Sequence, residues 1–164
     1  MSERINDKIK EIEKYLKELE EIRPDTIEAY TQDIKTKAAC ERYAEVVIEA
    51  IIDLAFLSIK EKKLPSPESD LQAFDILFQN KIIQPEIADR LKDAKRMRNI
   101  LAHKYGEVDD SIIFNAVKDE LESDANDFIT SIKSMLAEKS AAKKNSKFHE
   151  KEKQNQAKNH KSQA

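Results

Sequence analysis

A single glycine, Gly106, is the feature of this 164-residue sequence that most restricts the folds it can adopt. Average usage would place about 11 glycines in a chain of this length. Tight reversals between strands depend on Gly, Asn-Gly or Pro, so a β-sandwich or β-barrel is excluded. One glycine also excludes the glycine-rich loops that hold phosphates in P-loop and dinucleotide-binding folds. Because 37% of the residues are charged and only four are Pro, the composition predicts an all-α protein.

The cysteine count and the apolar runs indicate the compartment. The single cysteine, Cys40, excludes an intramolecular disulfide and any CxxC zinc or redox motif. The first residues are charged throughout, which is not the pattern of a signal peptide. The longest apolar run, 46–59, is interrupted by Glu49 and Asp53 and is shorter than the roughly 20 residues that a membrane span needs. We therefore expect a cytoplasmic protein that does not enter membranes.

The charge is distributed unevenly along the chain. Residues 139–164 contain eight Lys and two Glu, a net charge of +6, whereas residues 1–138 contain 21 basic and 30 acidic side chains, a net charge of −9. The basic segment has one large apolar residue, Phe148, and cannot bury enough surface to offset the entropy of ordering. We predict a folded domain over 1–138 and a Lys-rich tail over 139–164 that is disordered or transiently helical. The tail either binds nucleic acid or keeps an acidic protein soluble.

Two amphipathic helices are predicted in the first half of the domain, where apolar residues recur every three or four positions. The first covers 3–22 and ends before Pro24. The second opens at Asp25, with Glu28 completing a capping box, and runs to about Lys62.

Three further helices are predicted in the second half. Ser69 with Gln72 caps the third, the fourth covers 85–104, and the fifth begins at Asp109 or Asp110 and runs to about residue 138. The predicted inward positions of the third and fourth helices are Leu71, Phe74, Leu77, Phe78, Ile87, Leu91, Ala94 and Leu101. Short connections between such helices are typical of an up-and-down bundle of about five helices.

The candidate chemistry lies at the end of the fourth helix, in the segment RNILAHKY that begins at Arg98. His103 is the one histidine outside the tail. At 100° per residue Arg98 falls on the apolar stripe of its helix, where a guanidinium must be paired or must line a cavity. Glu49 and Asp53, on the second helix, are its predicted acidic partners.

His103 is predicted on a different side of the same helix, about 140° from Arg98. Asn99, four residues before the histidine, shares its face. The helix C-terminus stabilises an imidazolium, which favours a histidine that takes up and releases a proton near neutral pH. The residues alone leave open a structural Arg–Glu pair beside an exposed histidine at a helix end.

At this segment the sequence resembles a known family. RNILAHKY matches the R-x4-H-x-Y motif of the HepT-like toxins, within the HEPN domain superfamily. The helix ERYAEVVIEAIIDLAFLSI, the loop with Pro65 and Pro67, residues 74–105 and the segment VDDSIIFNAVKDEL resemble that family in order and spacing. The resemblance covers roughly residues 3–138 and leaves the tail outside. Met97 stands where a Phe often precedes the family's Arg, a conservative difference.

The resemblance implies a helical homodimer that acts as a metal-independent ribonuclease without a cofactor. In such a protein His103 serves as general base or acid, Arg98 stabilises charge on the phosphorane, and Asn99 orients the histidine or binds a phosphate oxygen. The two motifs face a shared cleft, and we place Ile100 toward the interface. The substrate is RNA, because the attacking 2′-hydroxyl is absent from DNA.

The resemblance also implies a partner, a minimal nucleotidyltransferase antitoxin that attaches AMP to Tyr105. Taken alone, Tyr105 is explained equally well as a packing residue at a helix end. Two other functions remain open. One is a catalytically inactive HEPN binding module that partners a nucleotidyltransferase, and the other is a helical interaction module whose tail contacts nucleic acid.

Overall fold

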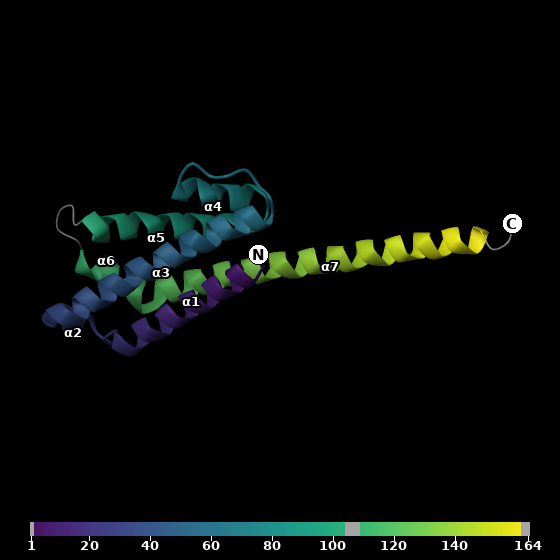
Figure 1. The fold of residues 1–164 in the computed structure, drawn as a ribbon. Helices are drawn as coiled ribbons and strands as arrows, with labels where there is room; N and C mark the ends of the chain where they lie inside the picture. Colours follow the sequence, from purple (N-terminus) through teal and green to yellow (C-terminus); the bar gives the residue numbers. More distant parts are fainter. Residues whose placement is uncertain (1, 104–108, 162–164) are drawn as a thin grey trace.

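The computed structural model describes residues 2–103 and 109–161, with side chains between residues 3 and 144 of these ranges. Within them every regular element is a helix, and no strand occurs. The helices run alongside one another in a bundle, and the last one projects far beyond it (Figure 1). The prediction of an all-α, up-and-down bundle is confirmed. No helix in the described ranges combines the length and apolarity that crossing a membrane requires.

Helix α1 (Ser2–Ile22) packs along α3 (Ile34–Glu61). Its one buried face repeats every three or four residues, as the sequence predicts. That face consists of Ile5, Ile9, Ile12, Leu16 and Leu19. Pro24 follows the end of α1, where its missing N–H prevents the helix from continuing.

The predicted second helix is divided in two, which corrects the expectation of one helix from Asp25 to Lys62. Helix α2 (Ile27–Gln32) is capped by Thr26, whose Oγ1 accepts from the Ala29 N–H at 3.3 Å. Asp33 then has an extended backbone and caps α3, because its carboxylate accepts from the Lys35 N–H at 3.0 Å. An Asp that satisfies first-turn N–H groups competes with helix continuation, so the chain restarts at this residue.

Helix α3 is the central element of the bundle. Its buried positions include Ile51, Ile52, Leu54 and Ala55, which point to several sides of the helix. Helices α1, α4 (Asp70–Gln79), α5 (Pro85–His103) and α7 (Leu121–Lys161) all contact α3. The nearly uniform apolarity of its second half is therefore explained by burial among neighbours, as predicted.

Helix α4 confirms its predicted cap, since Ser69 Oγ accepts from the Gln72 N–H at 3.2 Å. Phe74 and Leu77 are fully buried, but the inward placement of Phe78 is wrong, because 42% of it is exposed. The buried stripe of α4 is centred on Ala73, Phe74 and Leu77, which leaves Phe78 at its edge.

Helix α5 ends at His103, within one residue of the prediction. Leu91 and Leu101 are buried, and Ile87 and Ala94 are partly buried against the same core. Ion pairs also hold α5 to α4; in one of them Lys95 Nζ lies 2.7 Å from Asp70. These contacts fix the orientation of the helix that carries the candidate site.

The predicted fifth helix is interrupted by one π-helical turn. Asp109 caps α6 (Asp110–Asn115), its side chain accepting from the Ser111 N–H at 2.9 Å. The turn η1 (Ala116–Glu120) follows, and α7 begins at Leu121. Such π-turns insert an extra residue into a helix and are frequent beside functional sites.

Helix α7 continues to Lys161, whereas the sequence predicted that it ends near residue 138. Residues 139–161 of the tail are therefore helical in the structure. The sequence predicted a tail that is either disordered or transiently helical. Ala, Lys, Gln and Glu favour helix, and residues 139–161 contain no Gly or Pro to stop it. Lys139 pairs with Glu61 of α3, and beyond this contact the helix lies beside no other element in Figure 1.

Candidate active site

The motif residues occupy the last two turns of α5. Arg98 is partly buried, with 24% of its side chain exposed, and it forms an ion pair with Glu49 of α3. Glu49 is therefore an acidic partner of Arg98 in the structure. The Nε of Arg98 is buried and has no hydrogen-bond acceptor among the residues that the structure describes. The α3–α5 contact thus orients the guanidinium and leaves part of its donor capacity unused.

Asp53, the other acidic partner expected for Arg98, lies elsewhere. It forms an ion pair with Lys8 of α1, at 3.1 Å, and its side chain is 62% exposed. Asp53 lies four residues after Glu49 on α3, about 6 Å further along the axis and rotated by about 40°, and from there its carboxylate reaches Lys8 of α1. The structure thus assigns Asp53 to the α1–α3 contact, which corrects the expectation.

Asn99 and His103 are exposed on α5, one turn apart on the same side of the helix. Ile100 lies between them in sequence, and 45% of this large apolar side chain is exposed. Arg98 is about 140° around the helix from His103, so one copy of α5 presents the two residues on different sides. A reaction that uses both residues on one phosphate requires a second copy or a substrate that bends around the helix end.

Tyr105 lies in residues 104–108, outside the described residues. Its predicted place, two residues beyond the end of α5, is therefore known from the sequence alone. In the sequence it follows His103 by two residues and directly precedes Gly106.

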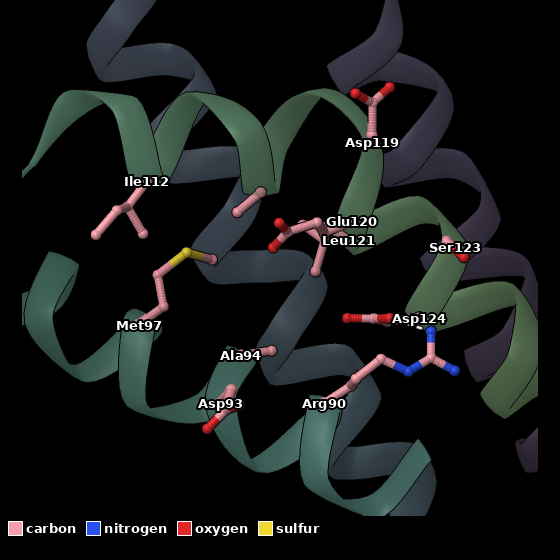
Figure 2. A pocket seen from close by; sticks show the side chains of 11 residues that line it. Arg90, Asp93, Ala94, Met97, Ile112, Asp119, Glu120, Leu121, Ser123 and Asp124 are labelled. Carbon is pink, nitrogen blue, oxygen red and sulfur yellow. Dashed lines mark hydrogen bonds and ion pairs between the residues drawn. The ribbon is translucent and has the colours of Figure 1, made fainter. Parts of the chain in front are cut away.

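A cavity of about 620 Å³ opens between α5 and the segment formed by α6, η1 and the start of α7. Figure 2 shows Met97 and Ala94 of α5 facing Leu121 across it, with Asp119 and Glu120 nearby. Sequence reasoning missed this cavity, because the π-turn that lines it leaves no clear pattern of residues. The cavity contains neither Arg98 nor His103.

Carboxylates give the cavity an acidic character. Arg90 is held by Asp124 at 2.5 Å and Asp127 at 2.6 Å, so its charge is already neutralised. Burial raises the pKa of Asp124 even though Arg90 opposes the shift. Asp93 pairs with Arg96 at 2.5 Å, whereas Asp119 and Glu120 add further negative charge to the lining. An RNA phosphate is repelled by such a lining, so this cavity is not the site for the phosphate.

Metal ligands do not gather in the described part of the chain. No group of three or more His, Cys, Asp or Glu side chains there has an arrangement suited to a metal ion. The carboxylates instead form ion pairs between helices, as Glu49 and Asp124 do. The groups that the described residues offer for phosphate chemistry are an arginine, an amide and an imidazole.

Comparison with known proteins covers the part of the chain that contains α5. The family described as ribonuclease HepT-like matches residues 12–135. The "mRNA nuclease HepT" of Shewanella oneidensis is 30% identical over 133 residues, which cover 81% of this chain and 98% of that protein. The "tRNA nuclease HepT" of Aphanizomenon flos-aquae is 24% identical over 113 residues, which cover 69% of this chain and 77% of that protein.

Solved structures show the same fold. The tri-AMPylated Shewanella oneidensis HEPN toxin, solved in complex with its MNT antitoxin, superposes with a TM-score of 0.76 at 30% identity. That comparison covers 82% of this chain and 99% of the toxin chain. The cytosolic protein YutE of Bacillus subtilis, of unknown function, is 21% identical with a TM-score of 0.70 over 84% of this chain and 92% of its own, and shares the fold.

The family match and the Shewanella oneidensis relative both span most of the domain, including the whole of α5. The R-x4-H motif lies inside the matched residues, and the helices expected from the resemblance are present. The chain therefore belongs to the HepT-like ribonuclease family.

Proposed function

We propose that this chain is a metal-independent endoribonuclease, cytoplasmic, and the toxin of a toxin–antitoxin pair. It cleaves RNA in a cleft shared by two copies, and its antitoxin is a nucleotidyltransferase. The observation that carries this proposal is the family match over residues 12–135, within which α5 presents Arg98, Asn99 and His103. The relatives named as mRNA and tRNA nucleases support RNA as the substrate class.

The proposed reaction is transfer of the phosphodiester to the neighbouring 2′-hydroxyl. The imidazole of His103 takes the proton of the 2′-OH while the O2′–P bond forms. The P–O5′ bond then breaks, and the leaving oxygen takes a proton from the imidazolium of the second copy's histidine. The products are a 2′,3′-cyclic phosphate and a 5′-hydroxyl, and atoms and charge balance without water or a metal.

Arg98 and Asn99 have separate roles in this scheme. The guanidinium donates two N–H groups toward the phosphorane oxygens, which carry extra negative charge in the transition state. Glu49 orients the guanidinium from α3 and is a positioning residue. Asn99, on the same face as His103, orients the imidazole or binds a phosphate oxygen.

The experiment that tests this proposal is cleavage of RNA by the purified chain in excess EDTA. Since arginine and histidine carry out every step, we expect the rate to be unchanged from that in buffer without chelator. Added Mg²⁺ changes the rate only through its effect on RNA structure. Loss of cleavage in EDTA with recovery on adding a divalent ion contradicts metal independence.

The shared cleft predicts a dimer whose interface includes Ile100. Introducing a charge into an apolar interface destabilises it strongly, so we expect Ile100→Asp to convert the dimer into a monomer and to abolish cleavage. Light scattering at micromolar concentration measures the mass. Ile34→Asp is the matched control, because Ile34 is 78% exposed at the start of α3, and it leaves the dimer intact. A monomeric wild-type protein that still cleaves RNA contradicts the shared cleft.

Regulation is proposed to act through Tyr105. The antitoxin transfers AMP from ATP to the phenolic oxygen, which loses its proton as pyrophosphate leaves. Each added phosphodiester brings negative charge and a bulky adenosine next to His103, and both oppose RNA binding.

We therefore expect Tyr105→Phe to retain most of the nuclease activity but to escape neutralisation by the antitoxin. Mass spectrometry of the co-expressed protein locates the AMP, and growth of cells that carry both genes measures neutralisation. AMP on another residue, or normal neutralisation of Tyr105→Phe, shows that the antitoxin inhibits by another route.

A further inference from the structure

The Lys-rich tail over 139–164 is the part of the chain that the family does not explain. The family match ends at residue 135. The Shewanella oneidensis relative is aligned over 98% of its length but with only 81% of this chain, so part of this chain has no counterpart in it. The residues proposed for catalysis all lie in the domain, so any contribution of the tail is additional to them.

The domain has an electrostatic disadvantage for a protein that binds RNA. Residues 1–138 carry a net charge of −9, and the tail carries +6. A negative domain repels a polyanion at long range, and the repulsion lowers both the rate of association and the affinity. The positive charge that can offset it is concentrated in the tail.

The structure extends this positive segment outward from the bundle. Lys139 anchors the start of the tail to the bundle, since its Nζ donates to the Glu61 carbonyl at 2.8 Å and to the Glu61 carboxylate at 2.5 Å. Beyond this anchor, Lys143 and Lys144 are exposed. The helix then continues to Lys161 with no element beside it (Figure 1).

Most lysine positions of the tail also fall on one side of a regular α-helix. At 100° per residue, seven of the eight fall within an arc of about 140°. Those seven are Lys139, Lys143, Lys144, Lys147, Lys151, Lys158 and Lys161. A one-sided set of lysine positions suits a strand of phosphates, and each Lys–phosphate contact releases condensed counterions.

We propose that the Lys-rich tail is a binding arm for single-stranded RNA, which holds the substrate by its phosphates without reading its sequence. The inference rests on RNA being the substrate of the domain. An arm of this kind lowers KM for RNA and leaves kcat unchanged, because it touches no reacting atom.

The position of the arm sets a minimum length for the RNA that benefits from it. Helix α5 starts at Pro85, at the end of the bundle from which the tail leaves, and it ends at His103 (Figure 1). The 19 residues of α5 span about 28 Å. At about 3.4 Å per nucleotide of a stacked strand, on the order of eight nucleotides are needed to reach from His103 to the tail.

The experiment compares two charge variants of the full chain in a His103→Ala background, which keeps the RNA intact. In the tail variant Gln replaces Lys143, Lys144, Lys147, Lys151, Lys158 and Lys161. In the matched control Gln replaces six exposed lysines of the domain, namely Lys10, Lys17, Lys35, Lys60, Lys63 and Lys81. Both variants lose six positive charges, so an effect of net charge alone is equal in the two.

Fluorescence anisotropy with a single-stranded RNA of about 20 nucleotides measures Kd from about 50 to 300 mM KCl. For the tail variant we expect Kd to rise at least about tenfold near 100 mM salt, and the slope of log affinity against log salt to shrink by up to about 4. The domain control changes Kd by less than about twofold. With His103 restored, the tail variant raises KM for the 20-nucleotide RNA and not for one of about six nucleotides.

Other outcomes overturn the inference. Equal losses in the two variants show that only net charge matters, and unchanged RNA affinity shows that the tail does not bind RNA. Loss of binding to phosphatidylserine vesicles, with RNA affinity unchanged, assigns the tail to membranes. A change of oligomeric mass, again with RNA affinity unchanged, assigns it to an acidic surface of a second copy.

The inference and the proposed function fail separately. If the wild-type chain cleaves RNA and the tail variant binds RNA normally, the proposed role of the tail is wrong and the proposed ribonuclease function is retained. If RNA binding depends on the tail and the wild-type chain never cleaves RNA, the proposed ribonuclease function is wrong and the proposed role of the tail is retained.

Discussion

His103→Ala is expected to reduce the rate of RNA cleavage by about 10²–10⁴-fold, because general acid–base catalysis contributes a factor of that size. If both copies of the residue act on one phosphate, the loss lies at the upper end of this range. Growth inhibition by the expressed protein is lost with the activity. His103 is exposed at the end of α5, so its removal leaves no cavity in the core and the fold is retained.

The exposure of His103 makes it a cleaner test than Arg98. Removing Arg98 leaves Glu49 without its partner between α3 and α5, and the resulting loss of stability is mixed with the loss of activity. His149→Ala is the matched control, since it makes the same change in the tail, outside the family match. The wild type, His103→Ala and His149→Ala are expected to have equal thermal stability and dimer mass. If only His103→Ala loses cleavage, the loss is due to the missing catalytic imidazole rather than to a change in fold. Full cleavage by pure His103→Ala removes His103 from the mechanism.

The periodic features of the fold could be predicted from the sequence. The buried face of α1, the Ser69 cap of α4 and the end of α5 depend on spacing and on single capping residues, both of which are local. The pairing of Arg98 with Glu49 was also predictable, because a guanidinium on an apolar stripe requires a partner.

The sequence-based predictions were wrong in two situations. In one, several residues compete to cap a helix; in the other, the packing of neighbouring helices determines which side chains are buried or paired. Both Asp25 and Thr26 can cap a helix, and the sequence does not show that Asp33 restarts the backbone. Phe78 is exposed because the position of α4 against its neighbours, rather than its own hydrophobicity, fixes which residues are buried. Asp53 pairs with Lys8 because of its reach toward α1, which depends on how the bundle packs.

The residues of the candidate site could be predicted from the sequence, but the arrangement of the elements around them could be predicted only in part. The sequence placed Arg98, Asn99 and His103 on one helix, which the structure shows as α5. The acidic cavity between α5 and η1 could not be predicted, because a π-turn has no distinctive residue pattern. Its acidic lining repels phosphate, so the candidate residues for phosphate chemistry remain those at the end of α5.

The second large effect that the mechanism predicts is the loss of cleavage when the nucleophile is removed from the RNA. If the attacking group is the ribose 2′-hydroxyl, a single 2′-deoxy substitution at the cleaved nucleotide removes the nucleophile itself. Cleavage at that bond then falls below detection, while bonds at neighbouring ribonucleotides are cut as before. A water or metal-bound hydroxide nucleophile does not need the 2′-hydroxyl, and such an enzyme still cuts the substituted bond.

The most direct measurement therefore uses the purified wild-type chain in EDTA with two RNA oligonucleotides that differ by this one oxygen atom, and identifies the product ends by mass spectrometry. The account predicts that the all-ribose RNA is cut to a 2′,3′-cyclic phosphate and a 5′-hydroxyl, and that the bond at the 2′-deoxy position stays intact. Cleavage at the 2′-deoxy position, or products that carry a 5′-phosphate, contradicts it.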